Sequence, residues 1–118
     1  MAYDEKLAAR IRALLSDRDD VAERPMFGGL TFMLGGHMCC GVNLDELIVR
    51  IGPDEEDAAL GQAHARPMDL TGRPMPGFVT VRPEGLKGPA LRRWVDQAVA
   101  YAEALPAKQP ARRGSGSG

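Results

Sequence analysis

The sequence predicts a two-layer α+β domain in which helices cover a five-stranded antiparallel sheet. Amphipathic helices are expected at residues 4–17 and 89–105, and a shorter helix at residues 54–60. The stretches between them contain short apolar runs that end at glycine or proline, which is typical of β-strands. Because these strands come in runs rather than singly between helices, the pattern favours α+β layering over a parallel doubly wound sheet. The predicted order is α-β-β-β-α-β-β-α.

The first and last predicted helices are each defined by an apolar stripe. Asp4 is expected to act as the N-cap of the first helix, and the charged segment 16–20 to end it in a solvated loop. The last helix is expected to begin at Pro89 and to end before Pro106. Both stripes are wide enough to cover a sheet. The apolar positions at helical spacing are Leu7, Ile11, Leu14 and Leu15 in the first helix, and Leu91, Trp94, Val95, Ala98, Tyr101, Ala102 and Leu105 in the last.

The predicted strands are bounded by glycine and proline. Gly28-Gly29 and Gly35-Gly36 are interpreted as turn glycines, and the second pair joins two strands of a hairpin. Pro67 limits its strand to a sheet edge or a strand start, because proline has no backbone N–H to donate. The first three strands are expected to follow one another as a meander. The predicted strands are residues 30–34, 37–42, 47–51, 66–70 and 77–82.

Several short segments together carry a family resemblance. The segments are Arg-Pro-Met at 24–26 and again at 66–68, Leu-Ile-Val-Arg-Ile-Gly-Pro at 47–53, Gly-Leu at 85–86 and Leu-Arg-Arg-Trp at 91–94. Each Arg-Pro-Met precedes a glycine-containing turn and a strand, since the residue before proline is excluded from the helical region. Over residues 5–107 this pattern resembles the TfoX/Sxy N-terminal domain family.

The resemblance implies helices packed on a five-stranded antiparallel sheet, and a non-enzymatic module that works through protein contacts. It also implies a regulatory role linked to transcription or natural competence, since regulators of this type act with the cyclic-AMP receptor protein at promoters. Those regulators carry a second, C-terminal helical domain, whereas we expect a stand-alone N-terminal domain at residues 1–106. Residues 107–118 have no apolar periodicity and are expected to form a disordered tail.

Composition limits the classes of partner. A chain of 118 residues with 44% hydrophobic and 26% charged residues is long enough for one core. Its formal net charge of -1 gives no global positive field, so any association with nucleic acid is expected to be indirect. No apolar run approaches the ~20 residues of a membrane span, and no signal peptide is recognisable. We therefore expect a cytoplasmic protein without membrane contact.

Aromatic residues are few, so the predicted core relies on aliphatic side chains and methionine. The methionines have two interpretations, of which core filler is favoured over an adaptable binding surface. The residues predicted to be buried are Met26, Phe27, Phe32, Ile48, Val79, Val81, Trp94 and Val95. The methionines open to both interpretations are Met26, Met33, Met38, Met68 and Met75.

Motifs for chemistry are missing from the sequence. It contains no nucleophile elbow, phosphate-binding loop or metal-ligand motif, so we expect no catalytic, cofactor-binding or metal-binding residues. Cys39 and Cys40 are adjacent, and strand alternation predicts one thiol in the core and the other on the opposite face. His37 shares a strand face with Cys39, but two such residues alone make a poor zinc site. We therefore assign no redox or metal role to the thiols.

The arginines are the candidate interaction residues. Arg24, Arg66 and Arg73 each precede Pro-Met, and Arg50 and Arg82 lie in strand segments. Because all of them belong to one predicted sheet, we expect Arg24, Arg66 and Arg73 to lie close together and to bind an acidic partner or a phosphate. The alternative, which we favour, is that the arginines pair with nearby carboxylates or carbonyls and fix the turns.

Three functional hypotheses follow. The leading one is a cytoplasmic regulatory or protein-interaction domain whose partner is not identified, with a homodimer through the sheet face or an edge strand as one form. The second is a nucleic-acid-associated factor with an arginine patch, in which Trp94 would provide a ring for stacking on a base. The helical spacing of Trp94 favours a position in the core over this role. The third is a small enzyme or ligand-binding protein with a pocket between the sheet and the last helix. The arginines of the second hypothesis are Arg66, Arg73, Arg92 and Arg93.

Overall fold

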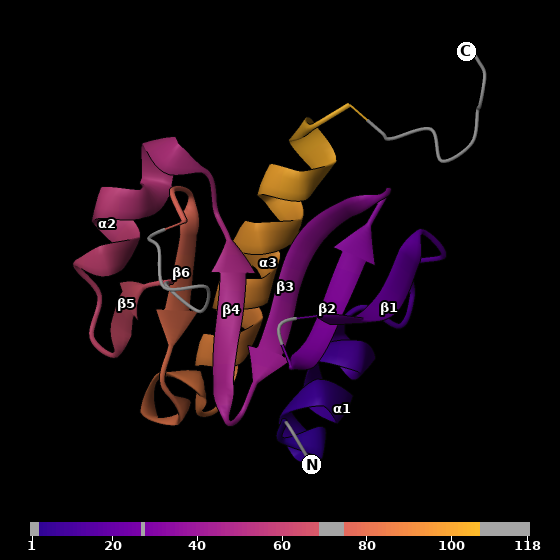
Figure 1. Cartoon of the computed structure of the whole chain (residues 1–118), viewed down its shortest axis with the longest axis horizontal. Helices are drawn as coiled ribbons and strands as arrows, with labels where there is room; N and C mark the ends of the chain where they lie inside the picture. Colours follow the sequence, from indigo (N-terminus) through magenta and orange to yellow (C-terminus); the bar gives the residue numbers. More distant parts are fainter. Residues whose placement is uncertain (1–2, 27, 69–74, 107–118) are drawn as a thin grey trace.

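The computed structural model of the chain describes residues 3–26, 28–68 and 75–106, and it confirms the predicted α+β class (Figure 1). The elements are α1 (Glu5–Leu14), β1 (Val21–Met26), β2 (Gly29–Leu34), β3 (His37–Asn43), β4 (Glu46–Arg50), the 3-10 helix η1 (Pro53–Glu55), α2 (Glu56–Leu60), β5 (Ala65–Pro67), β6 (Phe78–Val81), the 3-10 helix η2 (Pro83–Leu86) and α3 (Pro89–Ala104). The described strands form one antiparallel sheet in the order β1-β2-β3-β4-β6-β5. The predicted tail at 107–118 lies outside the described residues.

Helices α1 and α3 lie on one face of the sheet (Figure 1). Asp4 caps α1 as predicted, since its side chain accepts hydrogen bonds from the backbone N–H groups of Lys6 and Leu7 at 2.8 and 3.1 Å. The apolar stripe of α3 is buried against the strands, with Trp94 5% exposed and Leu91 1% exposed. Burying each such large side chain contributes about 1.5–3 kcal/mol. This packing forms the main core.

The sheet has six strands rather than the five predicted, and the additional strand is β1. Its residues pair with β2 from Val21↔Leu34 to Met26↔Gly29. Four of its six residues are exposed and the two at its ends are half-buried. A strand that contributes so little to the core shows no apolar alternation in its sequence, which explains why the pattern does not reveal it.

Both edges of the sheet contain a proline. Pro25 lies in the edge strand β1, and Pro67 ends the opposite edge strand β5, which confirms the edge position predicted for Pro67. Proline on an edge removes a backbone donor, and this limits pairing with a further strand.

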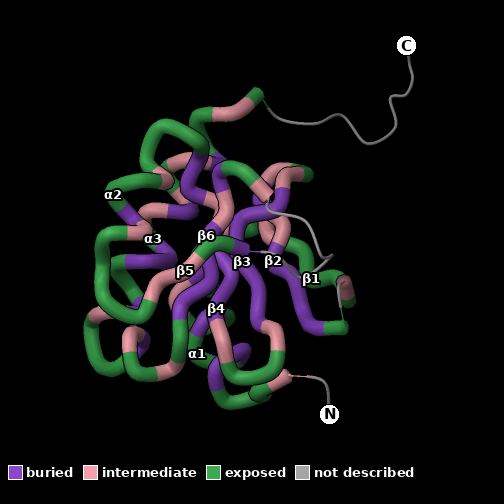
Figure 2. The backbone as a smooth tube through the Cα atoms, turned by 60° about the vertical axis from the view of Figure 1, so that its left-hand side comes forward, coloured by how far each residue is buried: buried purple, intermediate pink, exposed green. Residues whose placement is uncertain are grey.

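Two apolar clusters lie on the two faces of the sheet. The main core lies between the sheet and the helices, and it includes Phe32, Val79, Val81, Trp94 and Val95, all of which were predicted to be buried. Figure 2 shows the buried positions concentrated in the central strands, with exposed segments around them. A smaller cluster of buried Met38, Ile48 and Met68 lies apart from the main core. Of the other predicted core residues, Met26 is half-buried and Phe27 lies outside the described residues.

The prediction that Cys39 and Cys40 point to opposite faces is wrong. Phe32 pairs with Cys40 but the next residue of β2, Met33, pairs with Met38, so Cys39 is an extra residue in a β-bulge. A bulge sets two residues of one strand against one of its partner and interrupts the alternation of faces. Both thiols are therefore buried in the main core.

Among the described residues, no helix has the length and apolar character needed to cross a membrane.

Candidate functional site

The side of the sheet opposite α1 and α3, which we call the second face, gathers most of the predicted interaction residues. In an antiparallel sheet, directly paired residues project their side chains from the same face. The pairing register therefore places one row of side chains across all the strands on the second face. This row is Arg24, Thr31, Gly41, Ile48, Thr80 and Arg66.

The centre of the second face is apolar and rich in methionine. Met38, Ile48 and Met68 are buried there, and half-buried Met33, Met75 and Phe78 pack against them. The backbone N–H of Met75 donates to the carbonyl of Met68 at 3.0 Å, which keeps these two methionines adjacent. Two of the five methionines discussed above are thus buried as core filler, while Met33 and Met75 lie at the surface of this cluster.

Arg66 and Glu46 form a bidentate ion pair on the second face. Nη1 of Arg66 donates to Oε2 of Glu46 at 2.6 Å, and Nη2 donates to Oε1 at 2.7 Å. The hydrogen bonds from Arg66, followed by its charge and that of Arg82, hold the pKa of Glu46 below its usual range. Arg66 therefore has Glu46 as a carboxylate partner, as in the alternative favoured above.

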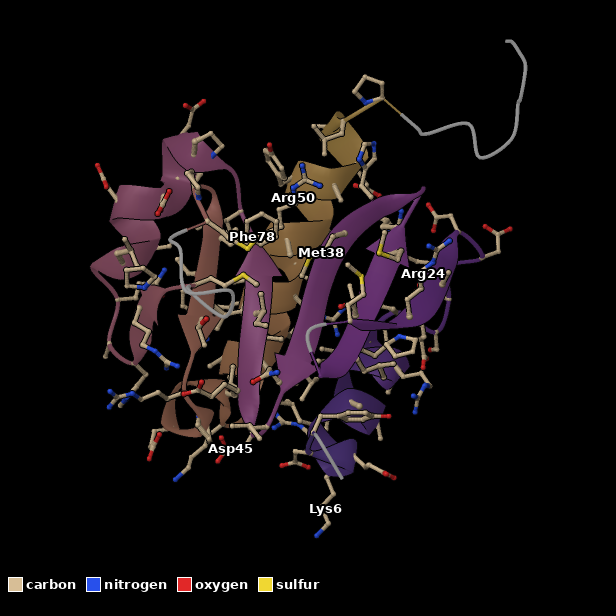
Figure 3. All side chains as sticks on the ribbon, in the orientation of Figure 1. Lys6, Arg24, Met38, Asp45, Arg50 and Phe78 are labelled. Atoms are coloured by element: carbon tan, nitrogen blue, oxygen red, sulfur yellow. The ribbon has the colours of Figure 1, made fainter. Side chains whose placement is uncertain are left out.

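Arg50 lies at the end of β4 between two aromatic rings. Its guanidinium carbon is 5.7 Å from the ring centroid of Phe78 and 5.5 Å from that of Tyr101 on α3, both within cation–π range. In Figure 3, Arg24, Met38, Arg50 and Phe78 are labelled across the side of the sheet opposite α3. Arg50 thus links the second face to the end of α3.

The expectation that Arg24 and Arg66 lie close together is wrong. They occupy the two ends of the cross-strand row, on β1 and β5 at opposite edges of the sheet. Five strand spacings of roughly 4.8 Å separate them by about 24 Å. Arg82 follows β6 near Glu46, whereas Arg73 lies outside the described residues. The arginines therefore frame an apolar surface and do not form one cluster.

The arginines of the nucleic-acid hypothesis are divided between the two sides of the sheet. Arg66 lies on the second face, whereas Arg92 and Arg93 are exposed on α3. Arg92 lies 3.7 Å from Asp96, one turn further along the helix. Trp94 is buried in the main core, as its helical spacing predicted. Its ring is not positioned to stack on a base.

A shallow hollow of about 310 Å³ lies between one end of the sheet and the end of α3, where the third hypothesis expected a pocket. Its lining includes Asp20, His37 and Glu103. Arg18 donates to both carboxylates, with 3.2 Å to Asp20 and 2.6 Å to Glu103. The imidazole of His37 contacts the carbonyl of Pro106. The polar groups of this hollow are thus already paired with groups of the same chain.

The thiols are poorly suited to chemistry. The neighbouring Cys39 thiol and complete burial both raise the pKa of Cys40 well above its usual range. A thiol of that kind carries little reactive thiolate. Within the described part of the chain, no group of three or more histidine, cysteine or carboxylate side chains is arranged to hold a metal ion.

Sequence reasoning missed two residues of the second face and its surroundings, Glu46 and Tyr101. The predicted strand began at residue 47, whereas β4 begins at Glu46. With the strand extended by this one residue, alternation places Glu46 on the same face as Ile48 and Arg50. Its pairing with Arg66 could not be found this way, because β6 lies between β4 and β5. Tyr101 was assigned to the apolar stripe of α3, and nothing in that stripe indicates a contact with Arg50.

The comparisons with known proteins agree with the fold. A family model described as the TfoX N-terminal domain matches residues 13–102. No curated protein and no solved structure matches the chain.

Proposed function

Because the chain belongs to the TfoX N-terminal domain family, we propose that it is a non-enzymatic regulatory module that binds another protein through the second face. The observation that carries the proposal is the second apolar cluster, which lies on the side of the sheet opposite the helices and separately from the main core. Met33, Met75 and Phe78 are only half-buried at its surface. A partner that covered them would remove further apolar area from water.

The chemistry of the second face suits protein recognition. Methionine side chains are flexible and polarisable, and they adapt to the shape of a partner. Methionine, arginine and aromatic residues are also enriched at protein interfaces relative to the rest of protein surfaces. The second face combines these residue types, with Met33 and Phe78 toward its centre and Arg24 on an edge strand.

A regulatory role is favoured over catalysis. The polar groups in the hollow beside α3 are paired within the chain, and the thiols are buried. The resemblance to regulators of natural competence favours a partner involved in control of transcription. We place the module in the cytoplasm, where two unpaired buried thiols fit a reducing environment.

The proposal is tested by making the second face polar without adding charge. The double variant Met33→Gln/Met75→Gln changes two half-buried residues of the face, and Leu14→Gln/Val99→Gln changes two half-buried residues on the helix side as a matched control. Each protein is melted thermally and then used to capture partners from its own cell extract. We expect the face variant to stay folded and to lose the captured protein, and the control to retain it. Equal capture by the wild type and the folded face variant would overturn the proposal.

A further inference from the structure

The second face carries an excess of positive charge. By pairing register and strand alternation, the described strands place Arg24, Arg50 and Arg66 on it, and Arg82 follows β6 close to Glu46. Glu46 is the one carboxylate that the described strands place there, and it is already bound to Arg66. The described residues thus give this face three positive charges in excess, although the whole chain has a formal net charge of -1.

Arginines elsewhere on the described chain are better compensated. On the helix side and around its loops, arginine is paired with a carboxylate in three places. These pairs are Arg12 with Glu23, Arg18 with Asp20 and Glu103, and Arg92 with Asp96. Among the described residues, no carboxylate lies within ion-pair distance of Arg24, Arg50 or Arg82. Arg10 and Arg93 on the helix side also have no carboxylate within this distance among the described residues. One of the four described arginines at the second face is therefore paired with a carboxylate, against three of the five elsewhere.

We propose that the second face binds an acidic segment of a partner protein in which carboxylates flank apolar side chains; this rests on the proposed function. The apolar side chains would cover Met33, Met75 and Phe78, and the carboxylates would accept charge-assisted hydrogen bonds from Arg24 and Arg82. Both arginines are exposed, so they can reorient toward a ligand. Charge complementarity of this kind mainly accelerates association and selects the partner.

Nucleic acid fits the second face less well. Single strands bind to sheets chiefly by stacking bases on exposed aromatic rings. Phe78 is the aromatic residue that the described strands place on this face, and the guanidinium of Arg50 already lies over its ring. The rest of the centre is methionine and isoleucine. An apolar protein side chain is a better match for such a centre than a phosphate backbone.

A second copy of the chain also fits less well. A symmetric dimer through the second face would bring the same patch of both copies together, and with it the same uncompensated arginines. Like charges across an interface are costly. Pairing of edge strands is opposed by Pro25 in β1 and Pro67 in β5. The charges therefore favour a partner with a different, acidic surface.

The test uses synthetic probes and isothermal titration calorimetry on the full chain. The probes are a peptide of alternating glutamate and leucine, its counterpart with lysine in place of glutamate, and a mixed-sequence single-stranded DNA oligonucleotide. The charge variant is Arg24→Gln/Arg82→Gln on the second face. Its matched control is Arg92→Gln/Arg93→Gln on α3. Met33→Gln/Met75→Gln is titrated in parallel, and sedimentation velocity is measured for the wild type.

We expect the acidic peptide to bind the wild type, and raised salt to weaken this binding. The charge variant should bind the acidic peptide about tenfold more weakly than the wild type, which corresponds to about 1.4 kcal/mol. The α3 control should bind as the wild type does. The charge proposal would be overturned if both peptides bound equally and if this binding were weakened by Met33→Gln/Met75→Gln but not by Arg24→Gln/Arg82→Gln. The proposed function would remain intact in that case. Tighter binding of the oligonucleotide through the same arginines, or a dimer that their substitution dissociates, would also overturn it. Absence of binding to every probe would count against it as well.

Discussion

Replacing Glu46 by Gln should remove the ion pair with Arg66 and lower the stability of the domain by about 1 kcal/mol. The two hydrogen bonds of 2.6 and 2.7 Å make this pair stronger than a typical surface contact. Solvent offsets part of that gain, because the side chain of Arg66 is 40% exposed and that of Glu46 is 20% exposed. For a chain of 118 residues, about 1 kcal/mol corresponds to a fall of about 4 °C in melting temperature.

The contribution of this pair should depend on pH in a defined direction. The hydrogen bonds from Arg66 lower the pKa of Glu46 in the folded chain below the value of about 4.3 expected in the unfolded chain. A carboxylate with a lowered pKa stabilises the fold fully above its unfolded pKa, and the effect is lost as the pH falls through its folded pKa. The wild type and Glu46→Gln should therefore differ in stability at neutral pH and converge in acid.

Urea unfolding at a series of pH values measures this difference. A double-mutant cycle with Arg66→Gln isolates the pair from the other contacts of Arg66. A coupling free energy near zero at neutral pH, or a difference between wild type and Glu46→Gln that does not change with pH, would refute the reasoning. The pair would then contribute nothing measurable to the free energy of unfolding, like many surface ion pairs.

Further predictions concern the core and the turns. Trp94→Ala should cost about 3–5 kcal/mol in urea unfolding, because the ring is only 5% exposed, and an unchanged melting temperature would contradict its packing. Gly29→Ala should lower the melting temperature more than Gly28→Ala. A methyl group at Gly29 would lie 2.0 Å from a backbone carbonyl oxygen of β3, whereas a methyl group at Gly28 would meet open space and is opposed only by the positive φ of 76°. A larger loss of melting temperature for Gly28→Ala than for Gly29→Ala would contradict the close approach at Gly29. Cys39 and Cys40 should react with a thiol reagent only as the chain unfolds, and rapid labelling of the native protein would contradict their burial.

Most of the fold could be predicted because apolar periodicity reports burial. The stripe of α3 includes Trp94 and Ala98, both buried, and the alternating or continuous apolar runs correspond to β2, β3, β4 and β6. Strand β1 escaped prediction for the same physical reason, since an exposed edge strand buries nothing that alternation could reveal. The thiol positions escaped because a β-bulge leaves no mark in the apolar pattern.

The arginines and methionines of the candidate site could be named from the sequence, but Glu46, Tyr101 and the arrangement of the site could not. Within the observed bounds of β4, strand alternation places Glu46, Ile48 and Arg50 on one face, but it cannot say which residues from other strands join them. That depends on the sheet order, in which β6 lies between β4 and β5 and so brings Arg66 within reach of Glu46. The same order places Arg24 on the far edge. The pairing register places Arg24 and Arg66 on a shared face, but the distance between them is set by strand pairing that no local sequence pattern specifies.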